Sequence, residues 1–185
     1  SVYVGDKVYK LRQIPCAGVV NPDCVLCIGA GGLIREEVLR EEMTWIPDCH
    51  DRLMIDGNAG IIEPVDYQEE ADSELVKHIG STAKGVGAAL RRKMGRRDFK
   101  TARMVDWLKP YIGNVSEYIN SQKDKSVMVE GTQGYGLSLN HGPYPFCTSR
   151  DVLASSLLSD VGLSPYSVKD IIMVIRTYPI RVAGN

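Results

Sequence analysis

The sequence predicts an α/β protein with a mainly parallel central sheet and flanking helices. Short apolar runs, such as residues 24–28 and 126–130, have the length and composition of buried strands. Other segments, such as residues 35–45, repeat apolar residues every three or four positions, which is the period of a helix. Strands that alternate with helices are typical of parallel sheets, in which a helix joins one strand to the next.

The first half of the chain is expected to contain a hairpin, strands and helices. Residues 2–14 alternate on both sides of Gly5-Asp6, which is typical of a hairpin. The run at residues 24–28 ends in Gly29-Ala30-Gly31-Gly32, so we expect a buried strand that leads into a loop. The other elements expected here are a helix at 35–45 with Val38, Leu39 and Met43 on one face, a strand at 52–55 and a polar surface helix at 69–78.

The second half is expected to continue the alternation. Glycines at residues 80–87 lead into a helix at 86–97, and residues 126–130 give the clearest strand pattern of the chain. The other expected elements are helices at 104–111, 115–122 and 152–158 and a last strand at 171–176. No repeat and no linker divides the chain, so we expect a single domain over residues 1–185.

Composition excludes several classes of protein. The 185 residues are 44% hydrophobic and 24% charged, which is typical of a globular protein rather than a disordered or fibrous one. No apolar run approaches the roughly 20 residues of a membrane-spanning helix. The formal net charge of −1 gives no reason to expect a membrane or a nucleic acid as partner.

The cysteines predict reduced thiols in the cytoplasm. The chain has five, an odd number that does not suit a framework of disulfides. Cys24 and Cys27 form a C-x-x-C pair inside an apolar run, but a zinc site would need a second pair. We therefore expect structural thiols, and because the three histidines lack metal spacing, no protein-built metal site.

A glycine-rich segment at residues 79–87 suggests phosphate binding. Its glycines allow backbone amides to approach an anion, Ser81 and Thr82 supply hydroxyl donors, and a helix N-terminus follows. The spacing differs from the G-x-x-x-x-G-K-[ST] phosphate loop. The alternative is that the glycines only form a tight turn into the helix.

The helix that follows is basic, with Arg91, Arg92, Lys93, Arg96 and Arg97. These side chains could form a solvated face, or they could present an arginine to a phosphate, which a guanidinium binds in a bidentate manner. A nucleic-acid interface is a third alternative, but the segment has no interleaved aromatic residues on which bases could stack.

A loop after the strand expected at residues 126–130 is the best candidate for a ligand site. Ligands bind beyond the carboxyl ends of parallel strands, and Gln133 lies there between glycines, as a neutral donor and acceptor. Farther along, Thr148 and Ser149 precede an expected helix and offer a second position for an anion. His141 has no recognisable nucleophile beside it, so a structural role is favoured over a general base.

Taken together, these segments resemble the adenylosuccinate synthetase family. The matching segments occur in the family's order: Leu11-Arg12-Gln13-Ile14-Pro15, Cys27-Ile28-Gly29-Ala30-Gly31, Ile79-Gly80-Ser81-Thr82, Gly85-Val86-Gly87, Glu130-Gly131-Thr132-Gln133-Gly134, Tyr144-Pro145-Phe146-Cys147-Thr148-Ser149 and residues 177–182. Each segment alone is modestly specific, whereas the ordered set is specific for the family. The resemblance implies an incomplete P-loop-NTPase-like synthetase fold.

The resemblance also implies a reaction. The family transfers the γ-phosphoryl group of GTP, with Mg²⁺, to O6 of IMP, and the amine of L-aspartate then displaces that phosphate to leave adenylosuccinate. By analogy, Gln133 is the catalytic residue that hydrogen-bonds the purine O6, while Thr82 and Thr148 hold the 5′-phosphate. Such an enzyme would act in purine nucleotide biosynthesis in the cytoplasm.

The remaining site residues follow from the same analogy. Leu137 and Val182 match contacts to the base and the ribose. Arg96 matches an arginine that reaches the nucleotide of the neighbouring subunit, which implies a homodimer through the helix that contains it. The resemblance gives no metal ligand within these residues.

The family's N-terminal Gly-Asp-Glu-Gly-Lys-Gly-Lys loop, its catalytic histidine and its aspartate- and guanine-binding segments do not occur in the 185 residues. We therefore expect an internal fragment that is inactive alone. The chain departs from the family's common pattern at Ser81, Ala83, Ala88, Asn140, Arg150-Asp151 and Ala183-Gly184-Asn185. Several of these departures resemble a viral branch that acts on (d)GMP and makes 2-aminoadenylosuccinate. IMP is the favoured nucleotide, and the alternatives are (d)GMP and a non-catalytic nucleotide-binding relative.

Overall fold

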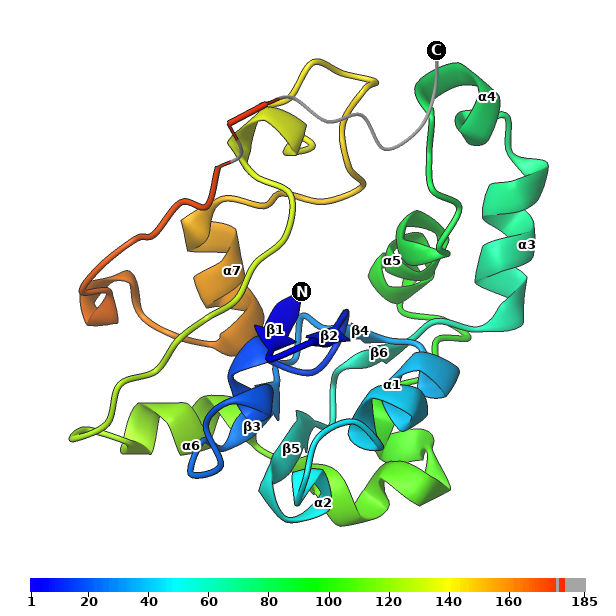
Figure 1. Cartoon of the computed structure of the whole chain (residues 1–185). Helices are drawn as coiled ribbons and strands as arrows, with labels where there is room; N and C mark the ends of the chain where they lie inside the picture. Colours follow the sequence, from blue (N-terminus) through cyan, green and yellow to red (C-terminus); the bar gives the residue numbers. More distant parts are fainter. Residues whose placement is uncertain (176, 179–185) are drawn as a thin grey trace. The chain divides into compact units, whose positions relative to one another are not determined.

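The computed structural model describes residues 1–175 together with 177 and 178. The chain forms two compact units (Figure 1). Unit 1 comprises residues 1–61, 99–130 and 160–163, and unit 2 comprises residues 62–98, 131–159 and the described residues from 164 onward. The expectation of a single domain over residues 1–185 stays a prediction.

Unit 1 contains the parallel sheet that the sequence predicts. Strands β3 (Leu26–Ile28), β5 (Leu53–Asp56) and β7 (Ile112–Gly113) pair in parallel in the order β3-β5-β7. A second parallel pair joins β4 (Leu33–Ile34) to β6 (Gly60–Ile61). The predicted fold class, an α/β protein with a parallel central sheet, is therefore confirmed.

The N-terminal hairpin is also confirmed. Strands β1 (Val2–Val4) and β2 (Lys7–Tyr9) pair antiparallel, with Val4 opposite Lys7. Gly5 in the turn has a φ of 56°, a left-handed conformation that glycine adopts without steric cost.

Helices α1 (Glu36–Met43), α2 (Cys49–Arg52) and α6 (Val115–Ser121) belong to unit 1. Helix α1 buries Val38, Leu39 and Met43, the face that its spacing predicts. Leu39 packs in a core with Leu26 and Ile55 of the sheet, and all three are fully buried. At the start of α6, the Asn114 side chain accepts a hydrogen bond from the Glu117 amide at 3.1 Å, an N-cap.

The segment of residues 11–15 is fixed to α1 by a buried carboxylate. Glu42 is fully buried and accepts hydrogen bonds from the backbone amides of Arg12, Gln13 and Ile14 at 2.7, 3.0 and 3.0 Å. The Gln13 side-chain amide completes this anchor, because it donates to the Arg35 carbonyl and accepts from the Arg35 amide.

The α-helix expected at residues 104–111 is wrong. The chain instead forms two 3-10 turns, η2 (Ala102–Met104) and η3 (Asp106–Tyr111), after another such turn, η1 (Cys16–Val19), earlier in unit 1. Pro110 lies inside η3 and has no N–H with which to continue an α-helical pattern.

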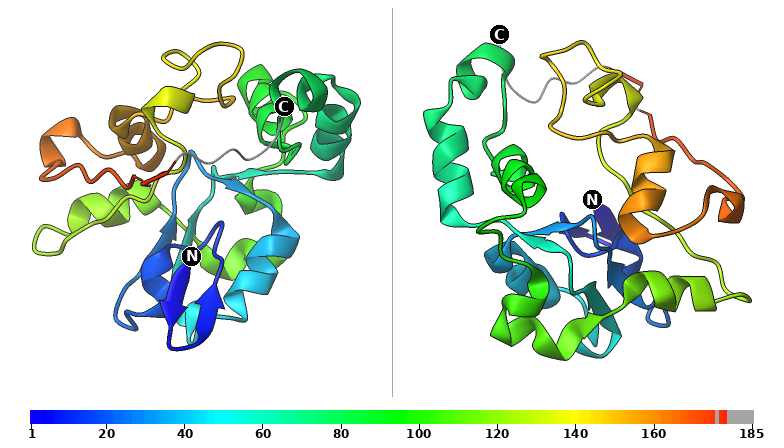
Figure 2. Two further views of the ribbon diagram at one scale, coloured as in Figure 1. Left: turned by 45° about the horizontal axis from the view of Figure 1, so that its top comes forward. Right: turned by 180° about the vertical axis from the view of Figure 1, so that it is seen from behind.

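Unit 2 contains α3 (Pro64–Asp72), α4 (Leu75–Ile79), α5 (Val86–Gly95), residues 154–159 of α7 (Ala154–Val161) and the 3-10 turns η4 (Tyr135–Leu137) and η5 (Pro165–Ser167). Figures 1 and 2 show α3 and α5 side by side. The single surface helix expected at residues 69–78 is wrong, because α3 starts earlier, at Pro64. Pro64 suits the first turn of a helix, and α3 ends where Ser73 adopts an extended backbone.

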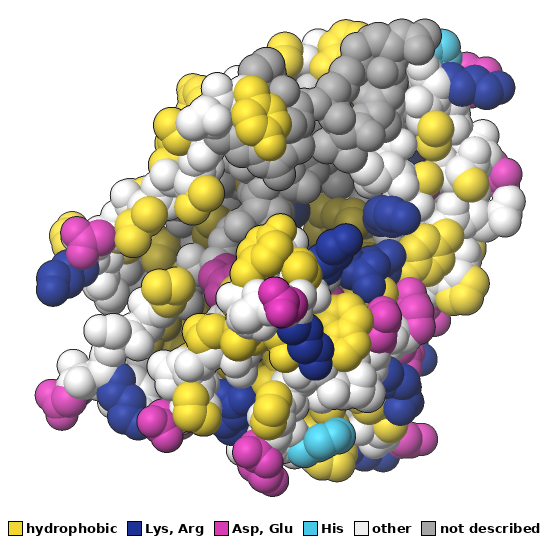
Figure 3. Space-filling model, in the orientation of Figure 1, with side chains coloured by type: hydrophobic (Ala, Val, Ile, Leu, Met, Phe, Trp, Pro, Cys, Tyr) yellow, Lys and Arg dark blue, Asp and Glu magenta, His cyan; other side chains and the backbone are white. Residues whose placement is uncertain are grey.

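Two expected strands are wrong. Residues 126–130 and 171–175 have no regular secondary structure, and Arg176 lies outside the described residues. Both segments are largely exposed, with Met128 at 77% and Val174 at 91%. A strand is stabilised by backbone hydrogen bonds to a neighbour, and in the described part of the chain neither segment has a paired neighbour. Figure 3 shows hydrophobic side chains at the surface among charged ones.

The five cysteines are free thiols, and Cys49 is fully buried. Burial raises the pKa of the Cys27 thiol to about 11. Among the described residues, no group of three or more His, Cys, Asp or Glu side chains could hold a metal ion. No helix in the described ranges is long and apolar enough to span a membrane.

Candidate functional site

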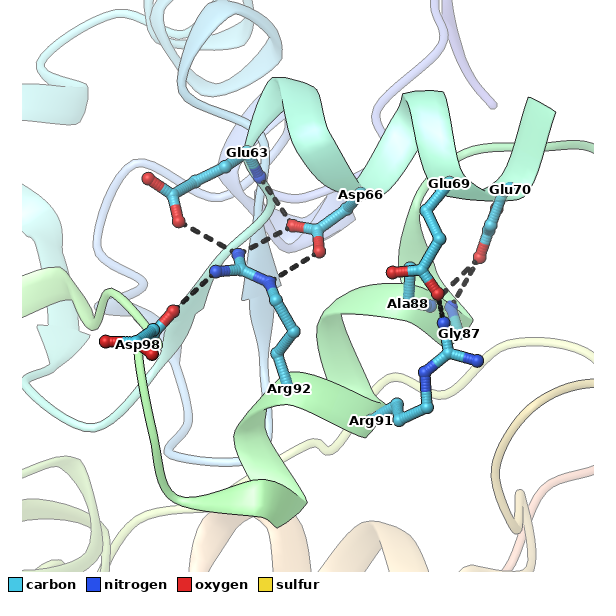
Figure 4. Close-up of polar contacts among 9 residues, drawn as sticks. All are labelled: Glu63, Asp66, Glu69, Glu70, Gly87, Ala88, Arg91, Arg92 and Asp98. Atoms are coloured by element: carbon cyan, nitrogen blue, oxygen red, sulfur yellow. Dashed lines mark hydrogen bonds and ion pairs between the residues drawn. The ribbon is translucent and has the colours of Figure 1, made fainter. Parts of the chain in front are cut away.

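The start of α5 is held by a carboxylate from α3. Glu70 is only 8% exposed and accepts hydrogen bonds from the amides of Gly85 and Gly87, both at 2.7 Å, and of Ala88 at 3.3 Å (Figure 4). These are amides that the first turn of a helix leaves without an intrahelical partner. A negative charge at this end is further stabilised by the helix dipole.

This contact corrects the expectation that the helix N-terminus is open to a phosphate. The amides of Gly85, Gly87 and Ala88 already donate to Glu70. The segment can still offer hydroxyl groups to an anion, among them that of Thr82, which is exposed. The alternative, in which the glycines form a tight turn into the helix, also agrees with the structure. Gly85 has a φ of 75°, and a Cβ there would lie 2.7 Å from Ile62.

The basic helix is divided between paired and exposed arginines. Arg92 donates from Nε to Asp66 at 2.7 Å and from Nη2 to Asp66 and Glu63, both at 2.9 Å. The hydrogen bond to Asp66 raises the pKa of the Arg92 guanidinium above its ordinary value. Arg91 forms an exposed ion pair with Glu69. Arg92 is therefore bound to α3 and does not present its guanidinium to a ligand.

Arg96 lies at the other end of α5, immediately after its last residue. Its backbone is left-handed, with a φ of 55°, and its amide donates to the Lys93 carbonyl. The side chain is exposed and, within the described ranges, makes no ion pair. Because α5 has ten residues, Arg96 lies about 15 Å from the start of the helix.

The acidic residues of α3 were not predicted from the sequence. Glu63, Asp66 and Glu70 are three and four positions apart, which places them on one face of a helix. Asp66 is fully buried and also accepts from the Glu63 amide at 2.8 Å, as part of a capping box. The spacing is the signal that could have identified this face, because a solvated surface helix has no need to align its carboxylates.

Gln133 and Leu137 lie in the loop between residues 131 and 151. Gln133 is exposed with a left-handed φ of 62°, and its side-chain oxygen accepts a hydrogen bond from the Thr132 hydroxyl at 2.5 Å. Leu137 is 46% exposed, and its carbonyl accepts a hydrogen bond from the Thr148 amide at 2.7 Å. Leu137 and Thr148 are therefore neighbours, although eleven positions separate them.

Ser149 brings this loop to the start of α5. A Cβ built on Gly87 would lie 3.2 Å from the Cβ of Ser149, so the two residues are in close contact. The anion position expected at Thr148 and Ser149, ahead of the following helix, stays a prediction, and α7 itself begins only at Ala154. The structure places the segment that contains Thr148 beside the first turn of α5, which follows the loop that contains Thr82.

The loop is braced by Asp151. The Ser138 hydroxyl donates to Asp151 at 2.5 Å, and the Asn140 amide donates to it at 3.1 Å. The hydrogen bond from Ser138, followed by that from Asn140, lowers the pKa of the Asp151 carboxyl. The ring of His141 stacks on Tyr135, with centroids 5.3 Å apart. Val182, the last predicted contact, lies outside the described residues.

Comparison with known proteins identifies the family. The sequence model described as adenylosuccinate synthetase matches residues 1–108 and 100–185. The chain belongs to the adenylosuccinate synthetase family. The predicted resemblance is thus confirmed. The adenylosuccinate synthetase of Methanococcus aeolicus is 40% identical over 98% of this chain and 55% of its own length. That of Methanocaldococcus jannaschii is 40% identical over 100% of this chain and 54% of its own length.

Two solved structures are similar to this member of the adenylosuccinate synthetase family. The fully ligated adenylosuccinate synthetase of Plasmodium falciparum matches with a TM-score of 0.80 at 20% identity, over 91% of this chain and 50% of that one. The succinoaminodeoxyadenylate synthetase of cyanophage S-2L, bound to dGMP and dATP, matches with a TM-score of 0.62 at 31% identity, over 76% of this chain and 41% of that one. The chain spans about half the length of the curated relatives that it matches.

Proposed function

We propose that this chain is the nucleotide-binding part of a ligase that joins L-aspartate to C6 of IMP with GTP in purine nucleotide biosynthesis. In the proposed reaction, the γ-phosphoryl group of GTP passes to O6 and leaves GDP. The aspartate amine then displaces phosphate and leaves adenylosuccinate. Membership of the family supports this reaction, and the free thiols suit a cytoplasmic protein.

The observation that carries the proposal is that, in unit 2, the segment that contains Leu137 and Thr148 lies beside the first turn of α5, which begins a few residues after Thr82. The hydrogen bond between Leu137 and Thr148 and the contact between Ser149 and Gly87 join segments that are far apart in the sequence. In the proposed complex, the hydroxyls of Thr82 and Thr148 donate to the 5′-phosphate, and Leu137 packs against the base or the ribose. Hydroxyl donors suit this task, since the nearby amides of α5 are already satisfied by Glu70.

Gln133 is the proposed catalytic residue. Its side chain is exposed, and a neutral amide can donate to the purine O6 as negative charge develops there. Mg²⁺ enters the proposal through the family, in which it neutralises charge on the transferred phosphoryl group. The described residues do not fit a protein-built metal site, because they contain no cluster of His, Cys, Asp or Glu side chains suited to one.

The position of Arg96 supports a homodimer. In one subunit, Arg96 and the loop that contains Thr82 lie at opposite ends of α5, about 15 Å apart. One phosphate group cannot bridge that length, so Arg96 would reach a nucleotide held by a second copy of the chain.

A second candidate substrate is (d)GMP, with 2-aminoadenylosuccinate as product. The observation in its favour is the cyanophage structure, which is described as bound to dGMP and is 31% identical to this chain. The curated relatives at 40% identity are more similar in sequence than this structure, and they are adenylosuccinate synthetases. IMP is therefore preferred. A non-catalytic nucleotide-binding relative would use the same site without the reaction.

Calorimetric titration of the chain with IMP, GMP and dGMP tests the proposal. Saturable binding of IMP, weakened by Gln133→Ala and by Arg96→Ala, is the expected result. Gln122→Ala and Arg97→Ala are matched controls, since they remove the same side chains at positions outside the proposed site. Preferential binding of dGMP would select the second candidate. Absence of binding by the folded chain, or equal losses in the controls, would contradict the proposed site.

A further inference from the structure

Helix α3 holds both ends of α5 through acidic side chains. Glu70, near the end of α3, accepts hydrogen bonds from the first amides of α5. Asp66, one turn earlier, accepts two hydrogen bonds from Arg92, in the last turn of α5. The two helices therefore run antiparallel, and Figure 4 shows the two contacts side by side along the pair.

The contact at the N-terminal end fixes the loop that contains Thr82. Three residues around Thr82 have a left-handed backbone: Gly80 at 68°, Ala83 at 47° and Gly85 at 75°. The two glycines adopt this conformation without steric cost, but Ala83 does not, so the segment needs outside contacts to keep it. The bond from the Gly85 amide to the Glu70 carboxylate supplies such a contact three residues after Thr82.

The contact at the C-terminal end fixes the turn that contains Arg96. Arg96 and Asp98 both have a left-handed backbone, with φ values of 55° and 48°. The Arg92 guanidinium donates from Nη1 to the Asp98 carbonyl at 2.6 Å while its other nitrogens bind Asp66 and Glu63. Arg92 thus ties the turn to α3, and Asp66 fixes the plane of the guanidinium that does so.

We propose that Glu70 and Asp66 are positioning residues for nucleotide binding. Glu70 acts through the loop that contains Thr82, and Asp66 acts through Arg92 on the turn that contains Arg96. This inference rests on the proposed function, which makes Thr82 and Arg96 nucleotide contacts. Neither carboxylate touches the nucleotide. Their role is to set the conformation of the two segments that do, with one helix as the common frame.

The neighbouring pair Glu69 and Arg91 provides matched controls. Glu69 lies next to Glu70 on α3, and Arg91 lies next to Arg92 on α5, yet their ion pair is exposed and involves neither the loop nor the turn. Glu69→Gln and Arg91→Gln therefore make the same chemical changes as Glu70→Gln and Arg92→Gln, without loss of either positioning contact.

The experiment measures the affinity of each variant of the chain for IMP and for inosine, which lacks the phosphate. Glu70→Gln and Arg92→Gln are each expected to weaken IMP binding about tenfold and to leave inosine binding unchanged. Hydrogen exchange of residues 80–88 is expected to accelerate in Glu70→Gln only. If Glu70→Gln does not fold, Glu70→Asp keeps the charge but shortens the side chain, and the same loss of IMP affinity is expected.

The outcomes separate the two proposals. If the unchanged chain binds neither IMP nor inosine, the proposed function fails, and this inference fails with it. If the chain binds IMP, and the affinities of the Glu70 and Arg92 variants for IMP lie within twofold of those of the control variants, only the positioning role fails. An equal loss of IMP and inosine affinity would also overturn it, because general destabilisation does not select for the phosphate.

Discussion

The ion pair between Asp66 and Arg92 is expected to dominate the stability of the α3–α5 pair. Asp66 is fully buried, and its carboxylate accepts from Arg92 Nε at 2.7 Å, from Arg92 Nη2 at 2.9 Å and from the Glu63 amide at 2.8 Å. Asp66→Asn keeps the shape of the side chain but removes its charge. One carboxylate oxygen also becomes an amide NH₂ group, a donor that faces the donors of Arg92 and the Glu63 amide.

The magnitude follows from burial. Removal of one partner from a buried ion pair costs about 3–5 kcal/mol, because the other charge stays desolvated. The Arg92 side chain is 20% exposed and keeps Glu63 and the Asp98 carbonyl as acceptors, so a loss of about 3 kcal/mol is expected. The control, Glu69→Gln, breaks a pair whose side chains are 39% and 71% exposed, and it is expected to cost less than about 1 kcal/mol.

Urea unfolding, followed by hydrogen exchange of peptides from α3 and α5, measures both changes. With a urea dependence of about 2 kcal/mol per molar, the midpoint for Asp66→Asn falls by about 1.5 M, and that for Glu69→Gln by less than about 0.5 M. Equal midpoints for the two variants would refute the reasoning, because they would show that burial of the pair does not set its contribution.

Three further results are expected. Burial raises the pKa of the Cys27 thiol from an ordinary 9.0 to about 11. At pH 8, mass-spectrometric mapping should therefore find that Cys27 is alkylated about a hundredfold more slowly than a solvent-exposed cysteine in a short peptide. Equal rates would contradict the burial. Asn114→Ala removes the N-cap of α6 and should lower the free energy of unfolding, measured by urea unfolding, by about 1 kcal/mol. Asn120→Ala, inside the same helix, is the control that tests whether loss of any asparagine has this effect. Hydrogen bonds from Ser138 and Asn140 lower the pKa of the Asp151 carboxyl below its ordinary value of 3.8. Their stabilisation of the loop is therefore complete above pH 3.8 and is lost as the pH falls through the lower pKa of the folded chain. An NMR titration midpoint at or above 3.8 would argue against these hydrogen bonds.

The local pattern of the sequence predicts the elements whose partners lie nearby. The hairpin forms because Val2–Val4 and Lys7–Tyr9 find each other across one turn, and α1 buries the face that its spacing sets. Residues 126–130 have an equally good strand pattern and form none, because in the described part of the chain no strand lies beside them. The strand propensity of a segment describes its local preference alone. A strand also needs a neighbouring strand to which its backbone can hydrogen-bond, and the local sequence pattern does not specify that neighbour.

The exposed residues of the candidate site could be predicted from the sequence, but the buried residues that position them could not. Thr82, Gln133 and Arg96 follow from a resemblance of motifs, and the structure places all three at the surface of unit 2. Glu70 and Asp66 were missed because a carboxylate on a polar helix is most often solvated. Only the packing of α3 against α5 shows that these two are buried.

The exposed run at residues 171–175 has a consequence for the behaviour of the chain in solution. Ile-Ile-Met-Val-Ile has no charge, no proline and no glycine, and its side chains are 71–91% exposed. That composition is typical of segments that stack into cross-β aggregates, since an exposed segment whose backbone has no paired neighbour can form a strand with the same segment of another molecule. Solubility should therefore fall steeply with protein concentration, and Val174→Lys, a charge at the most exposed position of the run, should restore it.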